Sequence, residues 1–568
     1  MKLLDTVRAL LVVGGLLSGA PACAQARGAA SMHAVEGLGT IAFPTSTQSA
    51  AAQDAFVRGS LLLHLFEYPD AAKSFREAER LDPAFAMAYW GEAMSHNHGI
   101  WNEVDEEAGR AALAKLGATP ADRAAKAPTQ REKDYLAAVE ILYSGVGTKQ
   151  ARDARYEQAM ERMANAYPDD ANAQLFHSLA LMGRSEGVRD VPAYLRAGRI
   201  AERIFKANRR DPGAAHYWIH SMDDPEHATA ALVPARALSS VAPEAAHAQH
   251  MTSHIFMALG MWDDVVSANE SAVRVGNAAR KRDNRPPAEC GHYLEWLEYA
   301  YYQQGRRRDA ARMLQGCRQS IPPALAWAEG HAAQLAATQS TPAMVGQGLN
   351  KSLIQMRGIA VVESDDGAGP AASMHVDAAG TGANAGWNEF IDAYAAVRRG
   401  DLPTAQASLA ALASLRAART SDDEAQTSAY LAILEDELRG LLQIQQGNFD
   451  VGLDALRRAA SSYEKVPFDF GPPVTFKPPH ELLGEQLLAH GDASAARKAF
   501  DAALERAPHR TTSLLGRARA EAASGDIAAA NATYKELVGI WHAADPELPE
   551  LREAQRFVAA QVRASDSR

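Results

Sequence analysis

The 568-residue sequence predicts an all-α protein made of repeated helical hairpins. Apolar residues recur at helical spacing on both sides of short turns. Small and large side chains follow one another in the same order along the second helix of several hairpins, and near the C-terminus this order returns after 34 residues. Because a single hairpin cannot bury its apolar face, consecutive hairpins are expected to stack into a solenoid.

The first hairpin is predicted within the stretch AAQDAFVRGSLLLHLFEYPDAAKSFREAERLDPAF. Two helical patterns flank a turn at Pro69, and Pro83 ends the second one. Ala71, Phe75 and Ala78 share one face of this second helix. The alanines allow two helices to approach closely, and the aromatic ring fills the space beside them.

The same order of turn glycine, small residue, large residue and helix end recurs later in the chain. It is found at Gly305, Ala310, Leu314, Cys317 and Pro322, then at Gly491, Ala496, Phe500, Ala503 and Pro508, and again at Gly525, Ala530, Tyr534 and Leu537. This pattern resembles the tetratricopeptide repeat (TPR), a helix-turn-helix unit of about 34 residues. The resemblance implies a right-handed α-solenoid in which the first helix of each pair lines the concave side.

Shifts in composition divide the predicted solenoid into two parts. The first TPR-like region, 35–339, carries the histidine-rich groove. The second is 386–560, and residues 340–385 lie between the two. This stretch is rich in Gly, Ala and Ser and has no helical period, so we expect an insert, a loop or a hinge there. A second irregular stretch, VPFDFGPPVTFKPP at 466–479, is too rich in proline for a helix and is expected to cross the surface as an extended strap.

Residues 1–26 are predicted to be a secretory signal peptide, because Lys2 and Arg8 precede an apolar run and small residues that offer cleavage sites. The protein is therefore expected in the periplasm or outside the cell, with lipid anchoring through Cys23 as the alternative. No later stretch is long and apolar enough to predict a transmembrane helix. A net charge of −11 without a basic stripe argues against nucleic acid as a partner.

Cys290 and Cys317 remain after removal of the predicted signal peptide. Cys290 lies at the start of the first helix of a predicted pair, and Cys317 lies near the end of the second, with the turn at Gly305 between them. Those ends are neighbours in an antiparallel hairpin, so a disulfide is geometrically permitted, and two free buried thiols are the alternative.

Five histidines fall on the first helices of two consecutive predicted hairpins. HAQHMTSHIF contains His247, His250 and His254, which share a wedge roughly 60° wide on a helix and are expected to flank the packing face. DPGAAHYWIHSMDDPEH contains His216 and His220, an i, i+4 pair that also shares a face. Counting from the preceding prolines aligns His216 with His247, whereas a full repeat aligns it with His250, and both alignments stay open.

The alternative functional hypothesis is a metalloprotein, possibly an enzyme, that binds zinc or copper through these five histidines. A purely structural role, as hydrogen-bonded histidines of the core, is the other interpretation of the cluster. Imidazole nitrogen is a common ligand of both metals, and histidine pairs from adjacent helices can place three or four nitrogens around one ion. The sequence has no HExxH motif, so the acid–base group of an enzyme would have to be Glu226 or Asp223.

The first functional hypothesis is a binding or scaffold protein that holds a peptide or a protein partner in its concave groove. The groove histidines would then make partner binding depend on pH between roughly 5 and 7. His177, His292, Trp90 and Trp218 are further candidates for the groove, with core packing as the alternative for the tryptophans.

Four blocks extend the resemblance beyond the general repeat. They are AMAYWGEAMSHNHGIW (86–101), HYWIHSMDDPEH (216–227), HAQHMTSHIFMALGMWDD (247–264) and FGPPVTFKPPHELLGEQLL (470–488). These blocks resemble a group of exported bacterial TPR proteins that carry a histidine-rich HxxHMxSHIF stretch. The resemblance implies the repeat fold and export, and it brings no assigned reaction, metal or oligomeric state.

Overall fold

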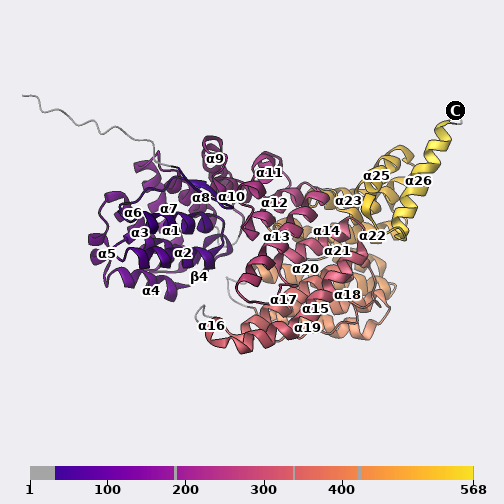
Figure 1. The fold of residues 1–568 in the computed structure, drawn as a ribbon. Coiled ribbons are helices and arrows are strands. Elements are labelled where there is room, and N and C mark those ends of the chain that lie inside the picture. Colours follow the sequence, from indigo (N-terminus) through magenta and orange to yellow (C-terminus); the bar gives the residue numbers. More distant parts are fainter. Residues whose placement is uncertain (1–31, 185–187, 337–339, 420–424, 567–568) are drawn as a thin grey trace, which may run out of the picture.

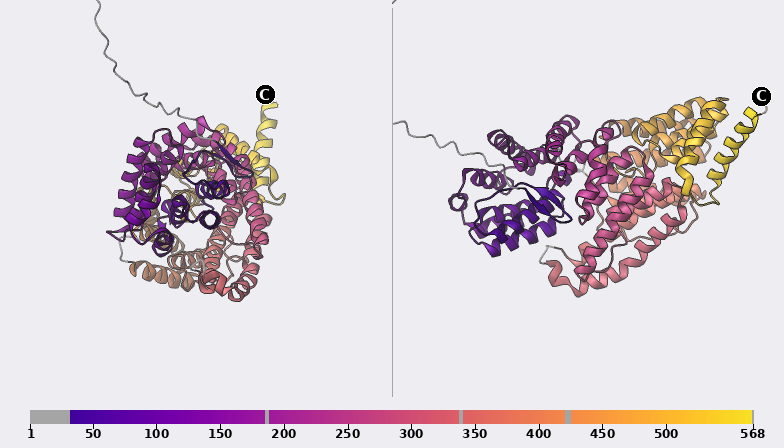
Figure 2. Two further views of the ribbon diagram at one scale, coloured as in Figure 1. Left: turned by 60° about the vertical axis from the view of Figure 1, so that its left-hand side comes forward. Right: turned by 45° about the horizontal axis from the view of Figure 1, so that its top comes forward.

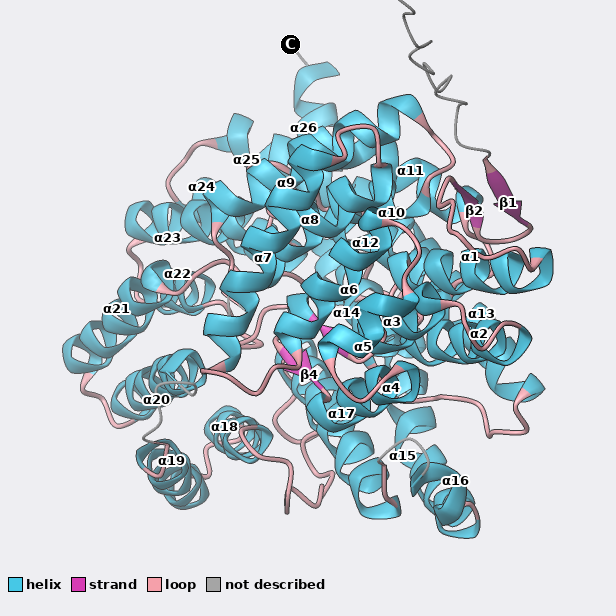
Figure 3. Ribbon diagram, turned by 90° about the vertical axis from the view of Figure 1, so that its left-hand side faces the viewer, coloured by secondary structure: helices cyan, strands magenta, loops and turns pink. Residues whose placement is uncertain are grey.

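The structure, a computed structural model, describes residues 32–184, 188–336, 340–419 and 425–566. Within these ranges the chain is mainly helical, and the few strands are short (Figure 3). The predicted signal peptide lies outside the described residues. No helix in the described ranges combines the length and the apolar character that a membrane span requires.

The helices before residue 290 are α1 (Ala50–His64), α2 (Tyr68–Leu81), α3 (Ala86–Met94), α4 (Glu106–Leu116), α5 (Pro120–Lys126), α6 (Gln130–Leu142), α7 (Lys149–Ala166), α8 (Ala171–Gly183), α9 (Val191–Ala207), α10 (Pro212–Ser221), α11 (Leu232–Val241), α12 (Ala246–Ala258) and α13 (Trp262–Arg282). They are followed by α14 (His292–Gln303), α15 (Arg307–Gly330), α16 (Ala332–Ala336), α17 (Pro342–Ser364), α18 (Asn384–Arg398), α19 (Leu402–Ala417), α20 (Ala425–Gln445), α21 (Phe449–Lys465), α22 (Pro479–Ala489), α23 (Ala493–Arg506), α24 (Thr511–Ala523), α25 (Ile527–Ile540) and α26 (Pro549–Asp566). Two antiparallel strand pairs lie near the N-terminus: β1 (His33–Val35) with β2 (Gly39–Ile41), and β3 (Asn97–His98) with β4 (Glu103–Val104).

Consecutive helices pack as hairpins, and consecutive hairpins stack. Helix α8 pairs with α9, α10 with α11 and α12 with α13, and the first helices α8, α10 and α12 lie side by side. The hairpins follow one another from the N-terminal end of the molecule to the C-terminal end (Figures 1 and 2). This arrangement confirms the predicted all-α, TPR-like solenoid.

The small and large residues of the repeat pack as the sequence predicts, with glycines at the closest contacts. Phe75 is fully buried, and a Cβ added at Gly59 of α1 or at Gly91 of α3 would lie 2.9 Å or 2.3 Å from its ring. The Phe500 ring of the last repeats fits between Gly484 of α22 and Gly516 of α24 in the same way, at 3.0 Å and 2.2 Å. Each ring therefore locks three successive helices together.

The interpretation of residues 340–385 as a loop or linker is wrong for its first half. Residues 342–364 form α17, a helix with Thr341 as its N-cap, and its residues from 352 to 362 are mostly buried. Helix α17 packs against α14, α15 and α18. The apolar stretch within this helix outweighs the Gly and Ala content that suggested a loop, and the non-helical residues of this region are 340–341 and 365–383. The division of the chain into two domains stays a prediction.

Two further sequence features have clear positions. Cys290 and Cys317 form a disulfide that joins the start of α14 to α15, with a Cα–Cα distance of 4.7 Å. The stretch 466–479 is non-helical over most of its length, as predicted, but part of it is buried rather than superficial. Phe476 packs against Gly358 of α17, and the Trp387 indole N–H donates to the Val474 carbonyl at 2.7 Å.

Candidate metal centre

The stacking of first helices brings the histidines of distant segments together. His216 and His220 lie on α10, His247, His250 and His254 lie on α12, and His292 begins α14. The ring centroids of His216 and His247 are 5.1 Å apart, and those of His220 and His254 are 5.8 Å apart. His216 therefore faces His247, which agrees with the alignment counted from the prolines.

These side chains do not line an open groove, contrary to the sequence prediction. The exposed fractions are 0% for His216 and His250, 2% for His220 and His254, and 8% for His247. Two distant segments fill the concave side at this point. Phe66, in the turn between α1 and α2, places its ring 4.4 Å from that of His216, and Phe470 lies 5.2 Å from His254.

His216, His220 and His247 form what we call the first triad. One nitrogen from each ring lies within 4.8 Å of the others. The Nε2 atom of each is buried and has no hydrogen-bond partner within the described part of the chain. The Nδ1–H of His216 donates to the His64 carbonyl at 2.7 Å, which leaves the lone pair of this ring on Nε2.

His250, His254 and His292 form what we call the second triad, and they too offer nitrogens within 4.8 Å of one another. His250 and His254 are buried, whereas His292 is exposed. The Nδ1 atoms of the two buried rings are held by Asn269 Oδ1 at 2.7 Å and by Asp223 Oδ2 at 2.5 Å. Trp296 of α14 packs against both rings, at 4.8 Å and 4.4 Å between centroids.

Burial keeps the imidazoles of the first triad neutral. Desolvation lowers the pKa of His216 to about 3, although the bond to the His64 carbonyl raises it. Burial also lowers the pKa of His220, His247 and His250 well below the usual value, and neighbouring histidines lower it further. Neutral imidazole is the form that ligates metals, so these rings are ready to bind near pH 7.

Residues near these rings fix the two helices that carry them. Asp211 caps the N-terminus of α10 by accepting the Ala214 N–H at 3.0 Å. Helix α12 has no side-chain cap of its own. The carboxylate of Glu67, from the α1–α2 turn, instead accepts the His247 N–H at 2.9 Å. The same turn thus closes the first triad with Phe66 and caps the helix that carries His247.

Three of the four further groove candidates lie elsewhere. Trp90 is in the core, where its ring packs against Phe43 and Phe176 rather than facing a groove. Trp218 is also buried, with its ring against Phe205. Both tryptophans are large apolar residues on the hairpin-packing face, which explains their burial. His177 is half-buried next to Glu157, with 3.4 Å between Nε2 and Oε1, whereas His292 joins the second triad.

The two acid–base candidates differ in position. Asp223 is buried and contacts His254, so it orients a ring of the cluster. Glu226 is exposed on the turn after α10, where its backbone N–H donates to Asp224. The structure therefore retains Asp223 and separates Glu226 from the histidines.

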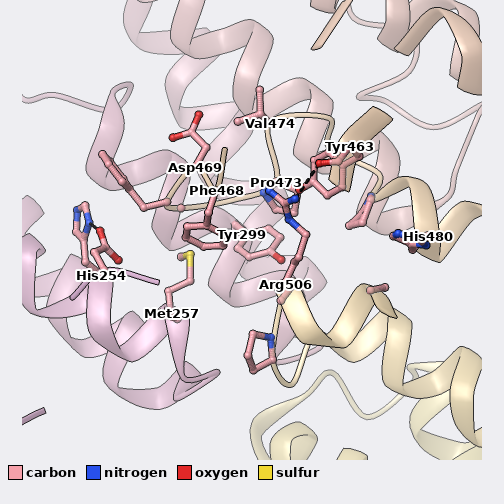
Figure 4. A pocket seen from close by; sticks show the side chains of 18 of the residues that line it. His254, Met257, Tyr299, Tyr463, Phe468, Asp469, Pro473, Val474, His480 and Arg506 are labelled. Atoms are coloured by element: carbon pink, nitrogen blue, oxygen red, sulfur yellow. Dashed lines mark hydrogen bonds and ion pairs between the residues drawn. The ribbon is translucent and has the colours of Figure 1, made fainter. Parts of the chain in front are cut away.

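A pocket adjoins the second triad beneath the 466–479 segment (Figure 4). His254 and Asp223 form part of its wall. The remaining wall is largely aromatic, with Trp262, Tyr299, Tyr430, Tyr463, Phe468 and Phe470. Burial, together with the charge of Asp223, raises the pKa of Asp469 in this wall to about 6.

Phe66, Glu67 and Asn269 were not among the site residues predicted from the sequence. Asn269 was detectable, because it occupies a helical position among the buried apolar residues of α13 and therefore needs a hydrogen-bond partner. Phe66 and Glu67 act through a turn in which Phe66 adopts a positive φ of 58°, and no local pattern places that turn beside α10 and α12.

Comparisons with known proteins add little to this description. No protein-family model and no curated protein matches the chain. The solved structures that are similar include the Cut9–Hcn1 assembly of the APC/C (TM-score 0.31, 11% identity, 91% of this chain and 78% of that chain). They also include yeast Tom70 (0.27, 10%, 91% and 90%) and human IFIT1 as a dimer with m7Gppp-AAAA (0.32, 13%, 88% and 92%). All three are TPR-type helical-repeat proteins. The fold of this chain is evident from its own stacked hairpins.

Proposed function

We propose that this chain is a transition-metal-binding protein whose primary site is the first triad. Two observations carry the proposal: each ring of the first triad offers one nitrogen within 4.8 Å of the others, and all three Nε2 atoms are buried without a hydrogen-bond partner among the described residues. Leaving one buried polar atom unsatisfied costs about 1–3 kcal/mol. A single ion bound to all three nitrogens would remove this cost three times.

The distances support one ion between these rings. An ion at the centre of a triangle with sides of 4.8 Å lies about 2.8 Å from each corner, and a Zn–N bond is about 2.1 Å. Shifts of less than about 1 Å in the rings would close the site. The His216 contact with a carbonyl through Nδ1 is the arrangement that orients metal-bound histidines in general.

The ligand set favours zinc or copper. Three neutral imidazoles suit borderline metals, whereas magnesium and calcium prefer oxygen ligands. Three protein ligands also leave a position for water or a substrate, as in catalytic zinc sites. The solenoid would serve as the rigid frame that holds helices α10 and α12 in register.

Export to the periplasm or the outside of the cell forms part of the proposal. The disulfide between Cys290 and Cys317 supports it, because such bonds persist in oxidising compartments. N-terminal sequencing of the mature protein tests it, with a start after Ala24 or Ala26 as the expected result. An intact Met1 in the exported fraction would contradict a cleaved signal.

Metal analysis of the purified protein tests the primary site. We expect zinc or copper to be bound by the wild type and lost from the first triad in His247→Gln. His247 is the most exposed ring of this triad, so the variant should fold, and His542→Ala, a surface change, is the control that keeps the metal. Less than about 0.1 equivalent of metal, with no uptake from micromolar zinc or copper, would refute the proposal.

A peptide-binding scaffold is the second candidate, favoured by a cleft between the α1–α2 hairpin and α13. Its wall carries charges of both signs, among them Arg58, Asp70, Glu244, Arg280 and Asp283. The histidines are not part of this wall, so partner binding through it would not follow histidine protonation. Cross-linking of wild type and Arg58→Glu in the exported fraction tests this candidate, and an unchanged set of cross-linked partners would argue against it.

A further inference from the structure

The two buried rings of the second triad meet in an unusual way. The Nε2 atoms of His250 and His254 lie 3.1 Å apart, within the same turn of α12. This distance is close to the roughly 3.3 Å that separates two nitrogen ligands on one tetrahedral zinc ion. The state of each ring follows from the partner of its other nitrogen.

The partner of His250 fixes the proton of that ring on Nδ1. The Asn269 amide nitrogen donates to the Val265 carbonyl at 2.9 Å, so its Oδ1 is the atom that faces His250 Nδ1. An amide oxygen accepts and cannot donate. His250 must therefore donate through Nδ1, and its Nε2 carries a lone pair.

The partner of His254 places a proton on Nδ1 as well. Asp223 Oδ2 lies 2.5 Å from this atom, and a carboxylate accepts hydrogen bonds. With Nδ1 protonated on both rings, two neutral imidazoles would point lone pairs at each other across 3.1 Å. Such a pair requires a cation between or beside the two nitrogens, either a proton or a metal ion.

The third ring distinguishes these two cations. His292, from α14, brings a further nitrogen within 4.8 Å of the other two, at a centroid distance of 4.6 Å from His250. A shared proton is satisfied by two nitrogens, whereas a metal ion takes three or four ligands. Asn269 and Asp223 supply the outer contacts that orient metal-bound histidines.

We propose that a second transition-metal ion binds His250, His254 and His292, so that the protein holds a two-metal centre with six histidine ligands. This inference rests on the proposed function of the first triad and extends it. The triads are adjacent, since His247 and His250 have ring centroids 6.1 Å apart. The ligand class is a pair of zinc or copper ions.

The two ions would differ in access. Phe66 covers the first triad, and its ring lies 5.6 Å from both His220 and His247. The second triad includes the exposed His292, and His254 also borders the aromatic pocket beneath the 466–479 segment (Figure 4). An external ligand therefore reaches the second ion first, and a substrate would meet the metal there.

Matched variants test the second ion. Metal-free protein is equilibrated with zinc alone or with copper alone, desalted, and analysed for metal per chain. We expect two equivalents in wild type and in the His542→Ala control, and one equivalent in each of His247→Gln and His292→Gln. His292 is exposed, and its ring also contacts Tyr293 and Trp296. Circular dichroism would verify that its replacement by glutamine leaves the fold intact.

The outcomes separate the two proposals. One equivalent in wild type that is lost in His247→Gln and kept in His292→Gln would overturn the second ion and leave the primary site standing. One equivalent that is lost in His292→Gln and kept in His247→Gln would refute the primary site and support the second triad. No metal in any form would overturn both and would leave a proton shared by His250 and His254.

Discussion

Replacement of Gly516 by alanine tests the packing that builds the solenoid. A Cβ at this position would lie 2.2 Å, 2.3 Å and 2.8 Å from three ring atoms of Phe500. Carbon atoms in favourable contact are about 3.5–4.0 Å apart. The ring cannot retreat, because it is fully buried and Gly484 of α22 lies on its other side, where an added Cβ would itself be only 3.0 Å from the ring.

The expected magnitude follows from two opposing effects. Overpacking in a well-packed core costs about 1–3 kcal/mol. Alanine in place of glycine within a helix gains about 1 kcal/mol. We therefore expect Gly516→Ala to lower stability by up to about 2 kcal/mol.

Gly539→Ala is the matched control, one helix further along in α25. Gly539 is exposed, and an added Cβ there would meet no heavy atom within 4 Å. This variant should gain about 0.5–1 kcal/mol from helix propensity. The difference in sign between two glycine-to-alanine changes isolates the contact with Phe500.

Thermal unfolding and hydrogen exchange measure the effect. Repeat proteins open locally, so the exchange of amides in α22–α24 reports this repeat better than a global midpoint does. Adding Phe500→Leu to Gly516→Ala should recover part of the loss, as a favourable coupling in a double-mutant cycle. If Gly516→Ala stabilised the protein as much as Gly539→Ala, the account of the repeat packing would be refuted.

Three further predictions concern the cluster, a buried acid and the disulfide. Asn269→Leu should weaken zinc binding at the second triad about 10–100-fold in competition titrations and leave zinc binding at the first triad unchanged. An equal loss of affinity at both triads would contradict the role assigned to Asn269. Burial raises the pKa of Glu298 well above its usual value, and the negative charge of Glu295 raises it further. The stability that the protonated group contributes is therefore lost as pH rises through that pKa. Glu298→Gln should therefore stabilise the protein increasingly as pH rises above the ordinary carboxyl pKa of about 4.5 in thermal scans, and a constant difference would be evidence against this. Cys290→Ser should cost about 3–4 kcal/mol for a separation of 27 residues, and an unchanged intact mass on reduction of wild type would exclude the bond to Cys317.

The prediction of the fold succeeded where the pattern was local. The spacing of Ala71, Phe75 and Ala78 predicted a helix that packs closely on its neighbours, and the structure buries all three. The prediction of a loop for residues 340–385 was wrong in its first half, because the Gly and Ala content was given more weight than the apolar stretch that α17 buries. Composition describes a whole window, whereas burial depends on which face of a helix meets the core.

The candidate site could be predicted in part. The placement of the five cluster histidines on consecutive first helices follows from the repeat, and the structure brings them together. His292 was assigned to a groove, although it completes the second triad, because the distance between first helices α12 and α14 is not encoded in either segment. The prediction that the histidines line an open groove was wrong, since a solenoid pattern does not reveal what fills its concave side.

The sequence by itself determined that helical hairpins stack in order and that imidazoles of successive units become neighbours, because both properties follow from the periodicity of side chains along a helix. Only the tertiary structure decided that the histidines divide into two triads and that five of these six rings are shielded from water, with His292 as the exception. That outcome depends on Phe66 and Glu67, which precede α12 by about 180 residues and reach it because the first hairpin packs into the curve of the solenoid. Contacts of this kind depend on the accumulated rotation of many repeats, so no single segment of the sequence contains them.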